Sequence, residues 1–444
     1  MAFVSEVTRI DGFVELRGEK RPIDGSMVDR SRSLAGQIRL AYEPGRDFNT
    51  QAELGYRTTK IEDAFVNQGD EDAESIAVRS TSRFGALRRA LQGNMFYEVV
   101  TERTPLLQET YVRTGPEVGQ FVWEDFNSDG IRQVDEFIPE RTPFEGAYVR
   151  TFLPSDDLES VINLQTRLRL DLNPSRLWRE PEGVVQALLG QVYGQTTIEI
   201  AEKSTEDQLS SIYLLDLSRF RSPETTLNGR LRLEQRLELF RTVVRYGLVL
   251  SVSQLKSLSR LSAGTEDRSR TTWRATGRYR FTPAYNLSVS TSYDKNRTFS
   301  EEFASRTFDL EAVSVEPQLL VAVSDALHAE LGAAYSKKED RQSADDLRRA
   351  TVWKFPVGLR YGLAGKLQLS GRVEVSSVDL DGDAVGYAAF ELTDGRGPGT
   401  AYLWNITGNY AVTQMIRSSF SYDGRAPSGA PTIHTVRAQF SLVF

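Results

Sequence analysis

The sequence predicts an all-β fold, a transmembrane antiparallel up-and-down β-barrel of about 18 strands, within a range of roughly 16 to 20. Three observations lead to this prediction. Apolar and polar residues alternate along many segments, short and long connections alternate between those segments, and 10% of the residues are aromatic, with 17 Tyr and 22 Phe. We interpret residues 1–444 as a single barrel domain.

The composition excludes several other classes of protein. No apolar run reaches the roughly 18 residues that a membrane-spanning helix needs, whereas a barrel strand needs only about 10 residues, half of them polar. The net charge of -7 argues against a nucleic-acid-binding protein that works through bulk charge. The chain contains no cysteine, so it has no disulfide, no thiolate metal site and no cysteine nucleophile.

The strand patterns are clearest in the second half of the chain. One parity of the segment 353–361 is wholly apolar: Trp353, Phe355, Val357, Leu359 and Tyr361. A soluble β-sandwich shows similar stripes. Tyr and Trp gather near the ends of the predicted strands, however, and this placement favours lipid interfaces over a buried core. Pro317 and Pro356 fall inside strand patterns, so we expect a bulge at each of them.

The connections alternate in length. Short turns are predicted near 44–47, 240–242, 282–284 and 362–365, and long connections near 203–225, 254–270 and 377–399. Outer-membrane barrels place short turns in the periplasm and long loops outside the cell. Residues 20–32 read as a polar loop near the amino-terminus. Residues 105–160 lack strand alternation for the longest stretch, and we expect them to form a long extracellular loop insertion.

The last thirteen residues, Thr432 to Phe444, form an apolar stripe on one parity and end on an aromatic residue. This segment resembles the C-terminal signal strand of bacterial (Gram-negative) outer-membrane β-barrel proteins. The resemblance implies a location in the bacterial outer membrane, contact with outer-membrane lipid, and recognition of the Phe444 strand by the barrel-assembly machinery. We expect this strand to close the barrel against residues 3–17.

One sharp motif lies inside the 105–160 insertion. Residues 125–136 fit the pattern D-x-[DN]-x-[DN]-G-x5-E, and the loop resembles an EF-hand-type calcium-binding loop. The resemblance implies oxygen ligands for Ca2+ from Asp125, Asn127, Asp129, Ile131, Gln133 and Glu136. The flanking residues lack helical periodicity, so the expected role is a structural one, the ordering of a long loop. The alternative is an acidic turn that binds no metal.

Arginine is frequent on the parity that faces the predicted lumen: Arg167, Arg169, Arg230, Arg232, Arg236, Arg245, Arg274, Arg278, Arg280, Arg360, Arg372, Arg417 and Arg437. Read as a functional feature, this wall favours anionic solutes. Read as an ordinary wet interior, the arginines pair with acidic residues across the strands, such as Glu234, Glu330 and Glu374. The two interpretations are compatible.

These features predict a pore or transport channel of the outer membrane. The alternatives are a structural or adhesive surface barrel that binds a partner through its loops, and the translocation barrel of a larger secretion or uptake complex. A protein partner or an oligomer is compatible with each of these functions. The chain contains only two histidines, His328 and His434, and has no nucleotide-binding or hydrolase motif, so we expect no enzymatic activity.

Overall fold

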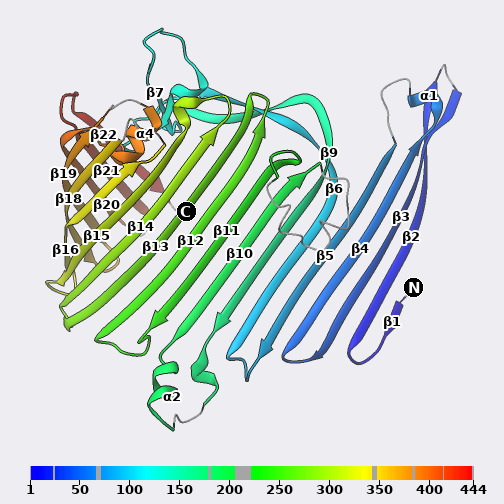
Figure 1. Cartoon of the computed structure of the whole chain (residues 1–444). Coiled ribbons are helices and arrows are strands. Elements are labelled where there is room, and N and C mark those ends of the chain that lie inside the picture. Colours follow the sequence, from blue (N-terminus) through cyan, green and yellow to red (C-terminus); the bar gives the residue numbers. More distant parts are fainter. Residues whose placement is uncertain are drawn as a thin grey trace. The chain divides into compact units, whose positions relative to one another are not determined.

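The computed structural model describes residues 2–23, 26–66, 72–178, 182–205, 222–342, 348–382, 386–413 and 415–442 (Figure 1). The described residues form 22 strands of one sheet with a few short helices, and every pairing described between them is antiparallel. The chain divides into two compact units. Unit 1 comprises 1–106, 154–237 and 254–261, and unit 2 comprises 107–153, 238–253 and 262–444.

Unit 1 holds the strands of the first part of the chain. Its elements are β1 (Ala2–Val4), β2 (Thr8–Ile23), β3 (Ser26–Gly45), β4 (Phe48–Ile61), α1 (Asp63–Val66), β5 (Ala73–Ala86), the first part of β6 (Leu91–Arg113), most of β9 (Tyr148–Leu172), η2 (Pro174–Arg176), α2 (Val184–Leu189), β10 (Tyr193–Ser204) and most of β11 (Thr226–Leu239). The second part of β12 (Tyr246–Leu261), from Gln254 onward, also belongs to unit 1.

The predicted polar loop over residues 20–32 is wrong. β2 continues to Ile23 and β3 begins at Ser26, with Lys20 opposite Asp29. The hairpin carries many charged residues, so its sequence resembles that of a loop. In the structure the opposite charges pair across the two strands, with Lys20 and Asp29 3.3 Å apart and Arg30 and Glu19 3.0 Å apart. Cross-strand ion pairs replace the apolar stripe as the stabilising contact.

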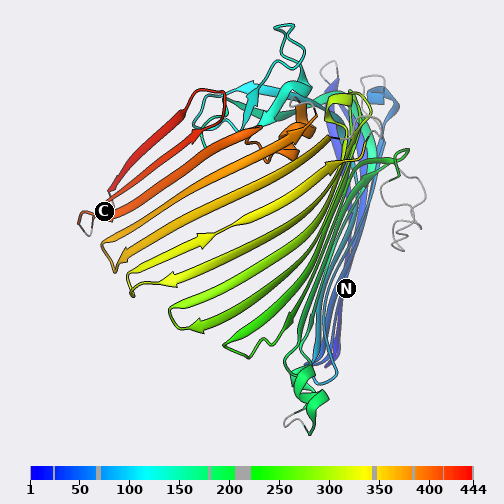
Figure 2. The same ribbon diagram turned by 60° about the vertical axis from the view of Figure 1, so that its left-hand side comes forward.

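Unit 2 holds an insertion and the strands of the second half, which lie side by side in chain order (Figure 2). Its elements are β7 (Phe121–Trp123), η1 (Val134–Glu136), β8 (Phe137–Pro139), β13 (Gly264–Thr282), β14 (Tyr285–Ser300), η3 (Ala304–Arg306), β15 (Phe308–Ala322), β16 (Leu327–Gly332), β17 (Ala334–Asp340), β18 (Arg348–Leu363), β19 (Leu367–Asp381), α4 (Gly386–Leu392), β20 (Gly399–Ala411), β21 (Ile416–Ala426) and β22 (Ile433–Leu442).

Two rows of aromatic residues on one face of unit 2 mark the membrane-spanning band. On four strands an exposed aromatic residue recurs after eight positions, and the pairs are Trp273 and Phe281, Tyr293 and Tyr285, Trp353 and Tyr361, and Tyr402 and Tyr410. Eight residues span roughly 26 Å of strand, or roughly 20 Å of membrane depth at a tilt of about 40°, which is close to the roughly 25 Å apolar band of an outer-membrane barrel. We call this the lipid-facing side and the opposite side the inner face.

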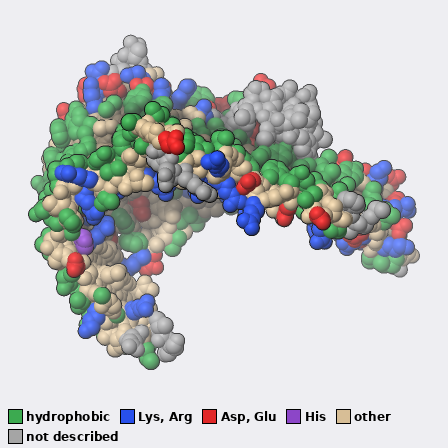
Figure 3. All heavy atoms as spheres, turned by 90° about the horizontal axis from the view of Figure 1, so that it is seen from below, with side chains coloured by type: hydrophobic (Ala, Val, Ile, Leu, Met, Phe, Trp, Pro, Cys, Tyr) green, Lys and Arg blue, Asp and Glu red, His purple; other side chains and the backbone are tan. Residues whose placement is uncertain are grey.

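Large apolar side chains are exposed throughout this band. Val357 is 46% exposed, Leu359 is 52% exposed and Val373 is 51% exposed, although all three lie in the middle of long strands. Figure 3 shows hydrophobic side chains in broad patches on the molecular surface rather than singly. A water-soluble protein rarely exposes such patches, so the fold requires a lipid environment.

The predicted bulges at Pro317 and Pro356 are wrong in their position. Pro317 lies in β15 opposite Val289 without a shift of register, and Pro356 lies in β18 opposite Glu374. The interruption instead falls on the strand between the two prolines, where Ala333 separates β16 from β17. Gly332 lies so close to Pro356 that a Cβ there would approach the ring to 2.8 Å. Neither proline has an N–H to donate, so the intervening strand loses ladder hydrogen bonds on both sides.

The predicted long connection over 254–270 is also wrong. β12 runs to Leu261 and β13 begins at Gly264, so the actual turn is short. β13 extends nine residues beyond Trp273 on the side away from Phe281. Beyond the lipid both faces of a strand are wet, so the apolar alternation disappears while the backbone ladder continues.

The predicted fold class is confirmed. Of the 22 strands among the described residues, β1, β7 and β8 are three residues long, and β16 and β17 are two halves of one interrupted strand, which leaves 18 long strands. The expected closure of the last strand against residues 3–17 would join the two units and stays a prediction. Phe444 lies outside the described residues, whereas Val436, Phe440 and Leu442 are exposed on one side of β22, as predicted. None of the described helices has the length and apolar character to cross a membrane.

Candidate functional site

The part of the insertion without long strands is shorter than the sequence indicates. β6 continues to Arg113 and β9 begins at Tyr148, so the irregular segment comprises residues 114–147. We call residues 114–147 the folded segment. β7 and β8 pair within it, and Gly119 packs on Gly146 so closely that a Cβ on Gly119 would lie 2.2 Å from the Gly146 carbonyl oxygen.

The EF-hand-like loop connects β7 to β8. Its backbone turns its carboxylates inward, because the amides of Asp129 and Gly130 donate to Asp125 and the amide of Ile131 donates to Asp129. The side chains of Asn127 and Gln133 both donate to Asp129. Gly130 has a φ of 73°, a left-handed conformation that glycine adopts without cost.

Glu136 completes the predicted ligand set from the other end of the loop. It is 1% exposed, and its carboxylate accepts hydrogen bonds from the Trp123 indole at 2.8 Å and from the Phe126 amide at 3.3 Å. Carboxylate oxygens of Asp125, Asp129 and Glu136 lie within 4.8 Å of one another. The structure thus brings these three predicted ligands together, with Asn127 and Gln133 beside them, while the Ile131 side chain points into solvent.

A buried arginine joins the folded segment to the strands. Arg306 of η3 is 2% exposed, and its guanidinium lies 3.0 Å from the Glu109 carboxylate and 3.5 Å from the Glu266 carboxylate. It also donates to the carbonyl oxygen of Val134 at the end of the EF-hand-like loop. Burial alone lowers the pKa of this guanidinium, but the hydrogen bonds with Glu109 outweigh burial and raise the pKa.

The folded segment also reaches the inner face of β21 and β22. The Glu145 carboxylate lies 2.5 Å from the Arg425 guanidinium, and both side chains are nearly buried. The Arg437 guanidinium lies 3.7 Å from the centroid of the Phe144 ring. A cavity of about 290 Å³ remains between residues 141–143 and the inner face of β19–β21. The segment therefore lies across the inner face and not outside the strands.

The short helix α4 covers the same end of the strands (Figure 1). Ala388 and Leu392 pack with Phe308, Val352 and Val378, which form an apolar cluster on the inner face beyond the outer aromatic row. This cluster explains why the sequence 386–392 is apolar although it lies in a predicted external loop. Burial of these apolar side chains holds α4 against the inner face of the strands.

Two lysines of the inner face hold the end of α4. The Asp394 carboxylate lies 2.5 Å from the Lys338 ammonium and 2.7 Å from the Lys354 ammonium. Burial by itself raises the pKa of Asp394, but the two ammonium groups outweigh burial and lower the pKa to about 2. Burial raises the pKa of the neighbouring Glu391, because that carboxylate lacks so close a cation.

Several of the predicted lumen arginines are ion-paired. Arg167 lies 2.8 Å from Glu199, Arg232 lies 2.5 Å from Glu234, and Arg372 lies 3.1 Å from Glu330. These pairs support the interpretation of an ordinary wet interior for part of the set. Arg280 and Arg360 line one cavity together with the paired Arg372, and Arg417 lines another.

The two histidines occupy different faces. His328 lines a cavity of the inner face, and His434 stacks on Tyr422, with ring centroids 6.1 Å apart, close to Trp404. The Tyr422 hydroxyl lies 3.0 Å from His434 Nδ1. His434 therefore lies among aromatic residues of the lipid-facing side, near a strand end.

The sequence interpretation missed the residues that hold the folded segment in place. Arg306, Glu109 and Glu145 carry no motif, and each pairs with a residue that is distant in the chain. The apolar run 386–392 between two glycine-containing stretches was a usable signal for α4. An apolar run in an external loop indicates that the loop folds back onto the protein.

The fold and its inner face define a membrane-spanning antiparallel β-barrel protein of the outer-membrane class. The aromatic rows and the exposed apolar band agree with the predicted location in a bacterial outer membrane. No protein-family model matches the sequence, and no curated protein matches it.

Solved structures resemble this chain at low identity. The ferric-catecholate import receptor Fiu of E. coli is 12% identical, with 98% of this chain and 71% of that chain covered and a TM-score of 0.41. The outer membrane protein OpdK of Pseudomonas aeruginosa is 10% identical, with 98% and 97% covered and a TM-score of 0.37. The FrpB iron transporter of Neisseria meningitidis is 8% identical, with 95% and 61% covered and a TM-score of 0.40. The function is argued below from the residues of this chain.

Proposed function

We propose that the protein is a pore or transport channel of the bacterial outer membrane whose outer mouth is narrowed by the folded segment and α4. The observation that carries this proposal is the contact of the folded segment with the inner face through Glu145 and Arg425. A loop that served only to bind an external partner would not need to bury an ion pair against the lumen wall. Long loops lie on the extracellular side of outer-membrane barrels, which places the narrowing at the outer mouth.

A channel of this kind should conduct ions. Purified protein in a planar bilayer should give steady single-channel steps, because the inner face retains two cavities lined by polar side chains, one beside the folded segment and one nearer the short turns. Heat-modifiable mobility in detergent provides the control that the inserted protein is a folded barrel. A folded, heat-modifiable protein that gives no conducting steps would contradict the channel and favour the structural or adhesive alternative.

We further propose that the EF-hand-like loop binds Ca2+ and that the ion orders the folded segment. The donor set fits a calcium ion, because it offers three carboxylates together with the Asn127 and Gln133 side chains beside them. Gathering three carboxylates within 4.8 Å of one another costs electrostatic free energy, and a divalent cation offsets that cost.

The calcium proposal predicts a change in protease resistance. Removing Ca2+ with a chelator should accelerate cleavage within residues 114–147, because the folded segment then loses the ion that orders it. Asp129→Ala should have the same effect, because the loop loses its central carboxylate. Added Ca2+ should restore resistance to the chelated protein but not to the Asp129→Ala variant. Glu117→Gln is the matched control, since Glu117 is an exposed acid of the same segment outside the loop. Equal cleavage with and without chelator would overturn the proposal.

A further inference from the structure

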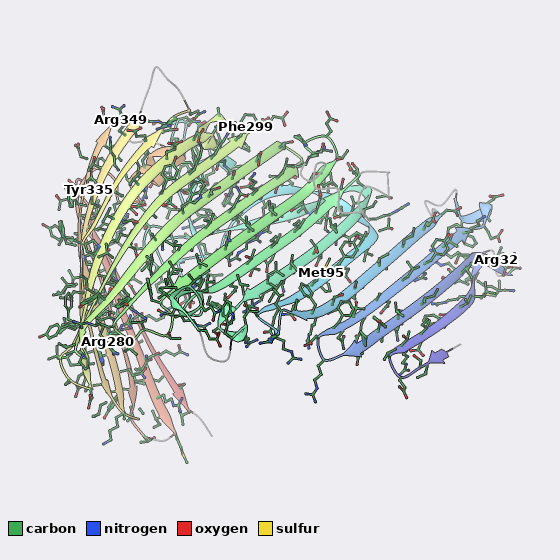
Figure 4. The ribbon with its side chains drawn as sticks, turned by 60° about the horizontal axis from the view of Figure 1, so that its bottom comes forward. Arg32, Met95, Arg280, Phe299, Tyr335 and Arg349 are labelled. Carbon is green, nitrogen blue, oxygen red and sulfur yellow. The ribbon has the colours of Figure 1, made fainter. Side chains whose placement is uncertain are left out.

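The inner face of unit 2 carries a second cavity, of about 630 Å³, near the short turns. Its polar residues occupy two neighbouring rows across the sheet. The register aligns Arg280, Asn286, Glu330, Arg372 and Asn405 in one row, and His328, Arg360 and Ser370 in the next. Figure 4 shows Arg280 at the end of β13, where the chain turns into β14. These rows lie level with the lipid-facing aromatic row that is nearer the short turns, because Phe281 and Tyr361 follow Arg280 and Arg360 in the sequence.

The cavity is rich in positive charge. Arg280, Arg360 and Arg372 line it, and Glu330 is its one acidic residue among the described lining residues. Glu330 pairs with Arg372 at 3.1 Å. Neither Arg280 nor Arg360 forms an ion pair among the described residues. Two guanidinium groups therefore face the cavity without a protein carboxylate, which is an arrangement suited to an anion.

The cavity also offers hydrogen-bond acceptors. The side-chain oxygen of Asn286 is buried and accepts no hydrogen bond within the described protein. The side chains of Ser370 and Asn405 lie on the same wall, and Gly358 leaves space between Glu330 and Gly371. A buried acceptor without a partner is costly unless a ligand or water donates to it. A ligand hydroxyl group would supply that donor.

The cavity adjoins the smaller one beneath the folded segment. Arg372 and Asn405 line both this cavity and the smaller one beneath residues 141–143 of the folded segment. From Val378, at the base of α4, to Arg372 is six residues along β19, or roughly 20 Å. A solute that passes the folded segment therefore meets the arginines of this cavity next.

We propose that this cavity is a binding site for small hydroxylated carboxylates, such as sugar acids, on their way through the channel. The carboxylate binds Arg280 and Arg360, and a hydroxyl group donates to the Asn286 side-chain oxygen. This inference rests on the proposed channel function and adds its substrate class.

Gluconate is the probe for the test. In planar bilayers, gluconate added at millimolar concentration should interrupt the chloride current of the wild-type channel, whereas glucose and acetate should do so weakly. Arg280→Gln and Arg360→Gln should each weaken the block about tenfold, which is typical for the loss of one charged hydrogen bond. Asn286→Ala should weaken the block by gluconate while leaving the response to acetate unchanged.

Arg274→Gln is the matched control, because Arg274 lies on β13 and faces the same side as Arg280 but does not line the cavity. If Arg274→Gln weakens the block as much as Arg280→Gln, a diffuse basic lumen replaces the specific site. Equilibrium dialysis of labelled gluconate against the detergent-solubilised protein separates the two hypotheses. Binding without conductance would refute the channel but keep the site, and conductance without binding would refute the site but keep the channel.

Discussion

Replacing Arg306 with methionine is expected to release the folded segment from the strands. The substitution leaves the Glu109 and Glu266 carboxylates in a site where they are 7% and 7% exposed, and Arg150 at 3.1 Å is then the nearest remaining cation of Glu109. Removing one partner of a buried ion pair typically costs about 3–5 kcal/mol. The loss of stability should fall on the folded segment, because Arg306 also donates a hydrogen bond to the Val134 carbonyl oxygen near the end of the EF-hand-like loop.

Limited proteolysis with mapping of the cut sites measures this release. Arg306→Met should be cut within residues 114–147 at low protease concentrations, while the strands stay protected. Arg349→Met is the control, because Arg349 forms an exposed pair at 3.5 Å with Glu339, and such pairs contribute at most about 1 kcal/mol. Cleavage of both variants at the wild-type rate would show that Arg306 does not hold the segment.

The second large effect is expected at the ion pair between Glu145 and Arg425. Arg425→Gln removes the charge that holds the folded segment against β21, where the two side chains are only 11% and 8% exposed. If the folded segment loses about 3 kcal/mol of stabilising free energy, the population of molecules in which it is displaced from β21 rises more than a hundredfold. Single-channel recordings should therefore show a larger open conductance, or frequent transitions to a larger level.

A charge-matched control separates this effect from a general change of lumen charge. Arg417→Gln removes the same charge from the inner face of β21 at its opposite end, away from the folded segment. It should leave the frequency of transitions unchanged. The charge exchange Glu145→Lys with Arg425→Glu should restore the wild-type pattern in part. Identical recordings for Arg425→Gln and Arg417→Gln would mean that the ion pair does not control the mouth.

The alternation of residues predicted most of the strand content. In β18 and β22 every second side chain contacts lipid, so the identity of each residue is tied to its face, and the strand is readable from the sequence. The same rule failed for residues 20–32 and 254–270, because those strand regions lie where both faces meet water. Polarity carries no information about the backbone there.

The EF-hand-like loop was readable for a different reason. Its geometry depends on contacts between residues at most thirteen positions apart, such as Asp129 with Asp125 and Glu136 with Trp123. Local hydrogen bonds of this kind are fixed by the order of residues. The loop is held against η3 by the contact between Asp135 and Ser305. These two residues are far apart in the chain, so no local sequence pattern predicts the contact.

The sequence alone determined that this chain is a barrel-type antiparallel sheet with an apolar outer side, a polar inner side and a calcium-loop-like insertion. Each of these properties follows from periodicity or from a short motif, which are local. The tertiary structure decided that the insertion folds onto the inner face, that α4 covers the same mouth, and that Arg280, Arg360 and Asn286 share one cavity. These features depend on strand register and on ion pairs between distant segments, which no single stretch of sequence specifies.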